Sequence, residues 1–233
     1  MSINSTRRTI NELILLAFTW VGLTWLFFAI VYPIAGLPSP APVPARTLIV
    51  LLLTWYLIRR HEGTWGDFGL TRPGVWLVLG VIVGLFIAKL LVAQGIETMT
   101  AWLSLDSQQS GATLFTSLEG NFPLLLLWLA IVWGIGAFGE EMIFRGFLLH
   151  RFAGLLGGTT LGWIFAVVIQ ALFFGLAHAW QGFYGMLATG LGALTYGIFY
   201  LIAGKNLWPV ILVHGIWDTL GLVLIYLHGE AVL

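Results

Sequence analysis

The chain has 233 residues and a formal net charge of zero; 59% of its residues are hydrophobic and only 9% are charged, with a mean hydropathy of +0.97. A soluble domain carries about 25% charged residues, so the composition excludes an ordinary soluble globular domain. The neutral balance, with no basic patch, gives no indication of nucleic-acid binding. The lack of cysteine excludes disulfides, thiolate metal sites and cysteine nucleophiles.

The apolar residues form long continuous blocks, which predict helices surrounded by lipid. Short alternating segments, typical of a membrane barrel, do not occur. We therefore expect an all-α, polytopic transmembrane helical bundle with about seven or eight spans. Seven spans are predicted, at residues 10–31, 47–58, 75–93, 123–152, 160–179, 183–203 and 207–226.

The N-terminal part is the least regular. Residues 37–44 (LPSPAPVP) predict an extended, solvated loop. The second span is shorter than the about 20 residues that a crossing needs, and if it does not cross, every later span inverts. Residues 1–45 have some features of a cleaved signal peptide. The long apolar run and Glu12 inside it favour retention.

Basic residues predict the orientation, because they collect on the cytoplasmic side. A cytoplasmic N-terminus and an outer C-terminus leave only Arg46 outside, near a helix end where it can snorkel. The inner residues are then Arg7, Arg8, Arg59, Arg60, Arg72, Arg151 and Lys205. We expect one membrane domain in two parts: residues 1–66, with two helices and the proline-rich loop, and a core at residues 67–226.

Glu140, Glu141 and Arg145 lie deep in the fourth predicted span. A charge at mid-bilayer costs a few kcal/mol, so such residues indicate function by default. A structural ion cluster between packed helices is the alternative. Glu141 and Arg145 share a helix face and predict an ion pair, whereas Glu140 is rotated about 100° away and is free to face something else.

Two histidines follow in later spans, His178 and His214. Asp218 lies one turn after His214, so its carboxylate can orient or charge the imidazole. A glutamate, two histidines and an aspartate can together activate water and stabilise an oxyanion. The alternatives are a satisfied core histidine at His178 and interhelical hydrogen bonding at His214. Lys89, in the third span, is expected to pair with a carboxylate or snorkel.

Counting from the predicted turn at residues 157–159, Glu140 and His178 reach the same depth in an antiparallel helix pair, about 28 Å at ~1.5 Å per residue. His214 lies only about 13 Å from its own turn by the same count. A protruding hairpin, a tilt or a broken helix could bring it level.

Other catalytic schemes lack their motifs. The sequence contains no HExxH run, no Gly-x-Ser-x-Gly and no phosphate loop or dinucleotide fingerprint. Asp218 is the only aspartate inside a predicted span, so an aspartyl dyad is also missing.

Three motifs in order resemble the CPBP family of intramembrane metalloproteases, which comprises CAAX prenyl proteases and bacteriocin-processing or immunity proteins and is also called the Abi family. The first is the glutamate pair with Arg145, the second is Phe174 followed by His178, and the third is His214 followed by Asp218. Residues 68–70 (FGL) are similar to a common lead-in, and the resemblance covers about residues 67–222.

By this resemblance Glu140 activates the hydrolytic water and His178 helps to bind it. His214 and Asp218 complete the catalytic site, while Glu141, Arg145 and Phe174 give structural support. CAAX-processing members carry asparagine at the position of Asp218. An ionised aspartate cannot donate a hydrogen bond to an oxyanion, so it is either protonated or used otherwise, for instance to orient His214.

Zn²⁺ or another divalent metal is a possible cofactor, with Glu140, His178 and His214 as three ligands and water as the fourth. A glutamate that acts as base cannot easily also be a ligand, so we favour a mechanism without an obligatory metal.

The leading hypothesis is an intramembrane endopeptidase of a prokaryotic plasma membrane that cuts a membrane-associated peptide or protein. A non-catalytic bacteriocin-immunity factor or membrane scaffold is the alternative. A small proton-relaying transporter is a third, although no convincing internal repeat supports it.

Overall fold

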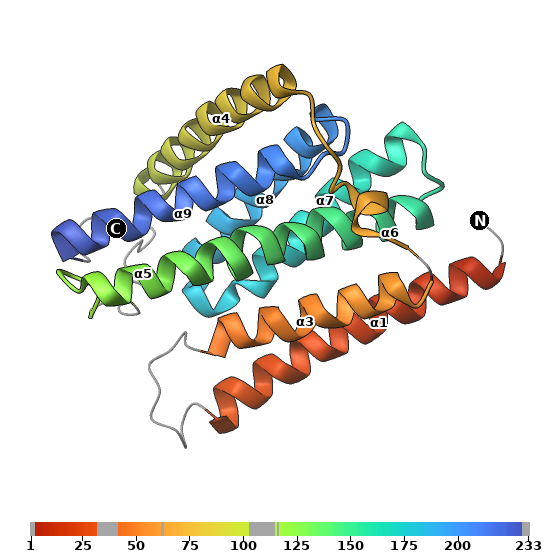
Figure 1. Ribbon diagram of the computed structural model, residues 1–233, viewed down its shortest axis with the longest axis horizontal. Helices are drawn as coiled ribbons and strands as arrows, with labels where there is room; N and C mark the ends of the chain where they lie inside the picture. Colours follow the sequence, from red (N-terminus) through yellow and green to blue (C-terminus); the bar gives the residue numbers. More distant parts are fainter. Residues whose placement is uncertain (1–2, 32–41, 62, 103–114, 116, 230–233) are drawn as a thin grey trace.

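The computed structural model describes residues 3–31, 42–61, 63–102, 115 and 117–229. Within these ranges every regular element is a helix (Figure 1). Six of the described helical stretches are long and apolar enough to cross a membrane: Ser5–Leu26, Val75–Trp102, Phe122–Leu155, Thr160–Ala177, Ala179–Ile202 and Trp208–His228. The protein is an integral, multi-pass, all-α membrane protein, and the prediction of about seven spans is confirmed.

The N-terminal helices form an antiparallel pair at one side of the bundle (Figure 1). Helix α1 (Ile3–Leu26) continues into the π-helical turn η1 (Phe27–Val31), and α3 (Pro42–Arg59) returns beside it. The predicted loop at residues 37–44 is wrong for its last part, because Pro42 and Pro44 belong to the first turn of α3. Proline suits that turn because its missing N–H would be unpaired there. The remainder of the predicted loop lies outside the described residues.

Helix α4 (Val75–Trp102) continues past its predicted end at residue 93. A short 3-10 helix, η2 (Trp65–Phe68), precedes it. The backbone N–H and the hydroxyl of Thr64 donate to the Asp67 carboxylate at 2.7 and 2.9 Å, and these bonds lower the pKa of Asp67. Gly69 follows with φ +102°, and a Cβ there would lie 2.5 Å from the Lys205 carbonyl oxygen. Only glycine therefore lets the lead-in pack on the turn that contains Lys205.

The central helix is a single long stretch made of four parts: α5 (Phe122–Ile131), η4 (Val132–Glu140), η5 (Met142–Leu148) and α6 (Leu149–Leu155). Both η segments have π-helical hydrogen bonding, which is rare and is frequently found at functional sites. This wide winding coincides with the glutamate pair and Arg145.

Helices α7 (Thr160–Ala177) and α8 (Gly182–Ile202) form a tight hairpin through the 3-10 turn η6 (Ala179–Gln181), and α9 (Trp208–His228) completes the bundle. A Cβ on Gly175 would lie 3.1 Å from the Gly190 Cα and 2.8 Å from the Met186 carbonyl oxygen. The glycines thus allow the backbones to approach closely, as small residues do where helices pack in a bilayer.

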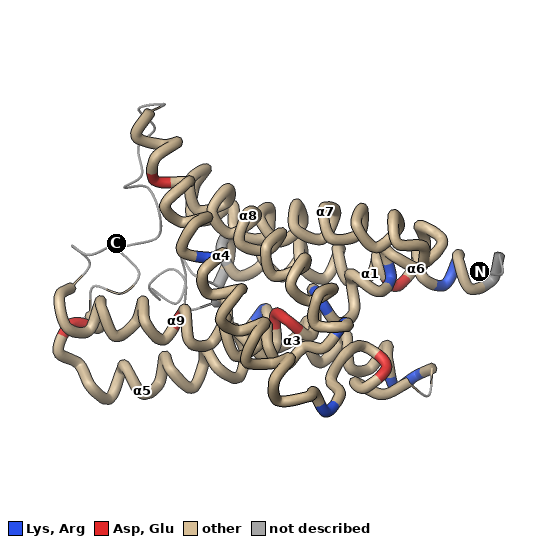
Figure 2. Tube along the Cα trace, turned by 90° about the horizontal axis from the view of Figure 1, so that it is seen from above, with Lys and Arg blue, Asp and Glu red and all other residues tan. Residues whose placement is uncertain are grey.

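Large apolar side chains cover the outside of the bundle, including Trp76, Trp102 and Phe18, which are 85%, 83% and 75% exposed. Charged residues are few and lie mainly towards helix ends and in one central group (Figure 2). Apolar side chains on the outside and charged side chains in the interior suit a bundle surrounded by lipid. The central group therefore holds the polar side chains that are available for chemistry.

Candidate active site

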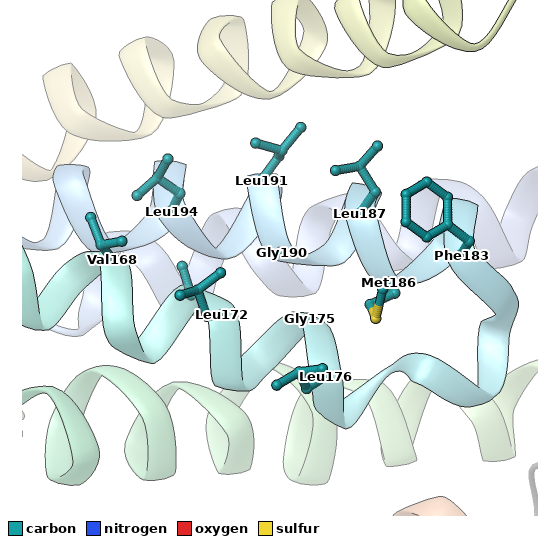
Figure 3. A pocket seen from close by; sticks show the side chains of 11 residues that line it. Val168, Leu172, Gly175, Leu176, Phe183, Met186, Leu187, Gly190, Leu191 and Leu194 are labelled. Atoms are coloured by element: carbon teal, nitrogen blue, oxygen red, sulfur yellow. The ribbon is translucent and has the colours of Figure 1, made fainter. Parts of the chain in front are cut away.

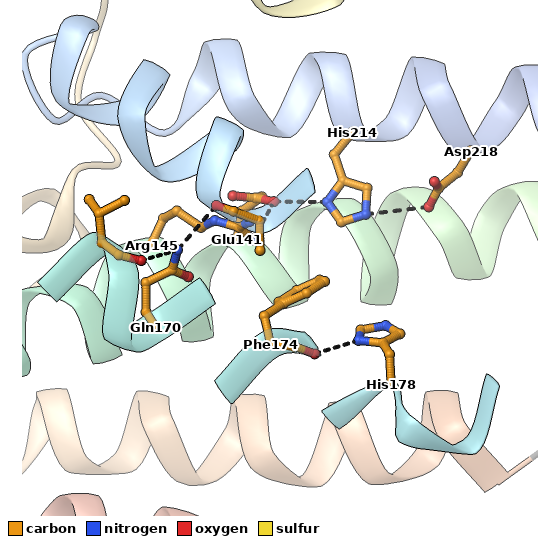
Figure 4. A network of polar contacts seen from close by, with 9 residues as sticks. Glu141, Arg145, Gln170, Phe174, His178, His214 and Asp218 are labelled. Atoms are coloured by element: carbon orange, nitrogen blue, oxygen red, sulfur yellow. Dashed lines mark hydrogen bonds and ion pairs between the residues drawn. The ribbon is translucent and has the colours of Figure 1, made fainter. Parts of the chain in front are cut away.

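Glu141 is the hub of the central polar group. Its Oε1 atom accepts from Arg145 Nη1 at 2.9 Å and contacts His214 Nδ1 at 2.8 Å (Figure 4). The carboxylate is fully buried. The predicted ion pair between Glu141 and Arg145 is therefore confirmed, and a third helix, α9, is attached to it through His214.

Arg145 ties the central helix to α7 and α8. Its Nη2 atom donates to the Ala193 carbonyl oxygen at 3.2 Å, and Gln170 Nε2 donates to the same oxygen at 3.1 Å. The guanidinium also lies 4.8 Å from the Phe174 ring centroid and 5.2 Å from that of Tyr196. Gln170 and Tyr196 were not predicted for this network. An amide inside an otherwise apolar span was the available signal for Gln170.

His214 lies between two carboxylates. Its Nε2 atom is 3.4 Å from Asp218 Oδ2, while Nδ1 meets Glu141. Ionised carboxylates only accept hydrogen bonds, so two such contacts need hydrogen on both ring nitrogens. The spacing-based prediction that Asp218 can orient His214 agrees with this geometry.

The predicted depth mismatch of His214 does not occur, because its Nδ1 atom contacts Glu141 at 2.8 Å. Lys205, in the α8–α9 turn, places Nζ 3.8 Å from the ring centroid of Trp163 in the first turn of α7. The α6–α7 turn therefore extends beyond the α8–α9 turn. Counting residues from both turns as if they were level underestimated the depth of His214.

His178 caps the C-terminal end of α7. Its Nδ1 atom lies 2.8 Å from the Phe174 carbonyl oxygen (Figure 4). A carbonyl only accepts, so Nδ1 carries the hydrogen and Nε2 of the neutral ring keeps a lone pair. The Phe174 ring stacks on the imidazole, with centroids 4.6 Å apart. Phe174 thus orients His178 through both its carbonyl and its ring.

Glu140 differs from its neighbour Glu141. It is 8% exposed, and no described residue forms a hydrogen bond or ion pair with its carboxylate. Its charge interacts with those of His214, Asp218 and Arg46, and the same three groups act on His178. Glu140 and His178 are therefore both within electrostatic range of the same three charged groups, and each has an unengaged acceptor atom.

Two cations approach this neighbourhood from helices outside the three motifs. Arg46 on α3 is 1% exposed, so the prediction that it snorkels to the outer surface is wrong. Its guanidinium stacks 4.1 Å from the Trp20 centroid and donates to Thr24 Oγ1 at 3.0 Å, which retains it inside. Lys89 on α4 lies 4.7 Å from the Trp217 centroid and interacts electrostatically with Asp218.

The predicted metal ligands Glu140, His178 and His214 do not form a ready three-ligand set. Both ring nitrogens of His214 already face carboxylates, so it could bind a metal only by giving up one of these contacts. Among the described residues no group of three or more histidine, aspartate and glutamate side chains is placed to hold a metal ion. A mechanism without an obligatory metal stays a prediction.

A separate groove of about 250 Å³ lies between α7 and α8 (Figure 3). Apolar side chains and glycines line it, among them Leu172, Gly175, Leu187 and Gly190. It contains none of the predicted site residues and offers no group for acid–base chemistry. The polar group around Glu140 is therefore the candidate active site.

The fold and this site define the chain as a multi-pass membrane protein with a buried cluster of carboxylates and histidines contributed by several helices. Residues 122–220 match the family described as type II CAAX prenyl endopeptidase Rce1-like, a segment that contains all three motifs. The resemblance to the CAAX protease family inferred from the motifs is therefore confirmed over this segment. No curated protein matches the chain. No solved structure matches it.

Proposed function

We propose that this protein is an intramembrane endopeptidase that hydrolyses a membrane-associated peptide or protein with water activated by Glu140 and His178. The observation that carries the proposal is the contrast between adjacent glutamates. The Oε1 atom of Glu141 is shared by Arg145 and His214 while its Oε2 has no hydrogen-bond partner, whereas neither oxygen of Glu140 has one among the described residues. A buried carboxylate without a hydrogen-bond partner suits a general base.

In the proposed reaction the water lies between the Glu140 carboxylate and His178 Nε2. Glu140 takes a proton as the water oxygen bonds to the scissile carbonyl carbon, and the carbonyl oxygen becomes an oxyanion. The carbon–nitrogen bond then breaks, and the leaving nitrogen receives the proton. No acyl-enzyme forms, because water is the nucleophile.

His214 is the proposed donor to the oxyanion. The 3.4 Å contact of its Nε2 with Asp218 is long for a hydrogen bond, so this N–H can be shared with a substrate oxygen. Asp218 then acts as an acceptor that orients the ring and needs no proton of its own. In this proposal an aspartate can therefore serve where CAAX-processing members have asparagine.

No step of this scheme passes through a metal, because the donor atoms around His214 are already engaged. The mechanism therefore predicts that chelators leave cleavage unchanged. Family likeness supports the class of reaction, and the substrate is open to experiment.

The test uses purified full-length protein in proteoliposomes with a pool of internally quenched peptides, prenylated and unprenylated, with and without chelator. Glu140→Gln is expected to lower kcat at least about 1,000-fold, because loss of the general base and of water positioning combine. Thermal unfolding in detergent should be unchanged within a few degrees.

Glu97→Gln, the same substitution at an exposed position on α4, is the matched control and should cleave normally. Full activity of Glu140→Gln would refute the role of the carboxylate. Absence of any cleavage by the wild-type protein, with a cellular phenotype that survives Glu140→Gln, would favour the non-catalytic alternative.

A further inference from the structure

Lys89 is a cation that the proposed reaction does not use. It lies near the middle of α4, a helix that is long and apolar enough to cross a membrane and lies outside the family-matched residues 122–220. A charged side chain at that depth is costly and is usually paired or functional. Among the described residues no carboxylate forms an ion pair with it within 4.0 Å. Its ammonium group is therefore held by something other than an ordinary salt bridge.

Two aromatic rings from two other helices hold the ammonium group. Its Nζ atom lies 4.7 Å from the ring centroid of Trp217 on α9 and 5.3 Å from that of Tyr196 on α8. Phe86, three residues earlier on α4, packs edge-on against Trp217 with centroids 5.8 Å apart. Gly192 on α8 leaves room for the ammonium group, because a Cβ there would lie 3.1 Å from Nζ. The side chain is thus directed towards α8 and α9, where cation–π contacts stabilise it.

The rings that hold Lys89 adjoin the polar residues of α9. The Tyr196 ring lies beside the His214 imidazole, with centroids 5.5 Å apart. Trp217 directly precedes Asp218 in the chain. Among charged groups, Asp218 has the strongest electrostatic interaction with Lys89. Lys89 therefore brings a positive charge from α4 into range of the His214–Asp218 pair.

The distance between His214 and Asp218 decides whether an oxyanion can be bound. Nε2 and Oδ2 are 3.4 Å apart, whereas a charged N–H and a carboxylate ordinarily approach to about 2.7–2.9 Å. At the shorter distance the carboxylate would compete with the oxyanion for the one hydrogen on Nε2. Lys89 attracts the same carboxylate from another helix and so opposes its approach to His214.

We propose that Lys89 is a positioning residue that restrains the Asp218 carboxylate, so that His214 Nε2 stays available as a donor to the oxyanion. The inference rests on the endopeptidase function proposed above. It makes α4 part of the active site, and it treats Lys89 and Asp218 as one unit shared by two helices. Because the oxyanion exists only during the reaction, the contribution of Lys89 is to kcat rather than to substrate binding.

The experiment is a double-mutant cycle on a peptide that the wild-type protein cleaves, with kcat and KM measured separately in proteoliposomes. Lys89→Met removes the charge and keeps an unbranched side chain. It should lower kcat by about 10- to 100-fold and change KM less than about threefold, as expected when an oxyanion donor is weakened. In an Asp218→Asn background the same substitution should lower kcat less than about threefold, because a neutral amide oxygen competes weakly for Nε2–H.

Two further variants separate the charge from the fold. Lys89→Arg keeps the positive charge and should recover most of the kcat that Lys89→Met loses. Lys205→Met is the matched control, because Lys205 also lies over a tryptophan ring, with Nζ 3.8 Å from the Trp163 centroid, but in a turn away from the central polar group. It should cleave as wild type. Thermal unfolding in detergent should stay within a few degrees of wild type for each variant.

Normal kcat in Lys89→Met, or equal losses with and without Asp218→Asn, would overturn this proposal while leaving the endopeptidase function intact. A fall in unfolding temperature that Asp218→Asn restores, with kcat per folded molecule unchanged, would also overturn it, because it indicates a structural pair. If the wild-type protein cleaves no peptide of the pool, the endopeptidase function fails and this inference fails with it.

Discussion

Two buried glutamates of this protein have nearly the same partners and different surroundings. Glu141 binds one arginine and one histidine, Arg145 at 2.9 Å and His214 at 2.8 Å. Glu12, on α1, is arranged in the same way at another place in the bundle.

The Glu12 cluster joins the N-terminal helices to the central helix. Glu12 contacts Arg151 on α6 at 2.8 Å and His61, just after α3, at 3.0 Å. The partner side chains are 16% and 29% exposed. No further ionisable side chain forms an ion pair with this cluster among the residues that the structure describes.

The difference lies in the next layer of residues. Near Glu141 are Glu140, whose carboxylate has no hydrogen-bond partner, and His178, whose tautomer is set by the Phe174 carbonyl oxygen. Arg46 adds two buried guanidinium nitrogens without a hydrogen-bond partner among the described residues.

At Glu12 the carboxylate pairs with His61 and Arg151, and the buried Arg151 Nε atom is left without a hydrogen-bond partner in the described part of the chain. An acid–histidine–arginine cluster is therefore not enough to define a site; the second carboxylate and the second imidazole near Glu141, both with unengaged acceptor atoms, are what indicate chemistry.

The largest expected effect comes from removing the charge that balances Glu141. Arg145→Met leaves a carboxylate buried without its cation, and breaking such a pair costs about 3–5 kcal/mol. We expect a strongly lowered unfolding temperature in detergent and loss of cleavage together. Near-normal stability in this variant would show that the cluster is not the structural hub described here.

A smaller effect is expected at the matched cluster. Glu12→Gln should cost about 1 kcal/mol, because the amide oxygen can still accept from Arg151 and water partly reaches both partners. Cleavage per folded molecule should be unchanged, measured as kcat alongside thermal unfolding. A fall in kcat without a fall in stability would mean that the two clusters are functionally coupled and that the comparison is wrong.

Much of this arrangement follows from helical periodicity. Spacing of four residues predicts that Arg145 reaches Glu141 and that Asp218 reaches His214, and both contacts occur. The ends of the apolar blocks likewise predict most helix ends to within a few residues. These are properties of one segment at a time, which the order of residues determines directly.

Contacts between segments were harder to predict. The depth of His214 depends on how far one hairpin projects past another, and the burial of Arg46 depends on Trp20 and Thr24 lying beside it on a different helix. Arg46 was the one basic residue that did not fit the predicted charge asymmetry. That exception was the only signal in the sequence that this side chain is held inside the bundle.

The central claim is that Glu140 and His178 act on one water molecule, and a double-mutant cycle tests it most directly. Single-turnover cleavage is measured for Glu140→Gln, for His178→Ala and for the double variant, with folding checked by thermal unfolding. Groups that act as a unit are strongly non-additive. We predict that the double variant is no slower than the slower single variant; losses that multiply, as for independent residues, would contradict the shared water.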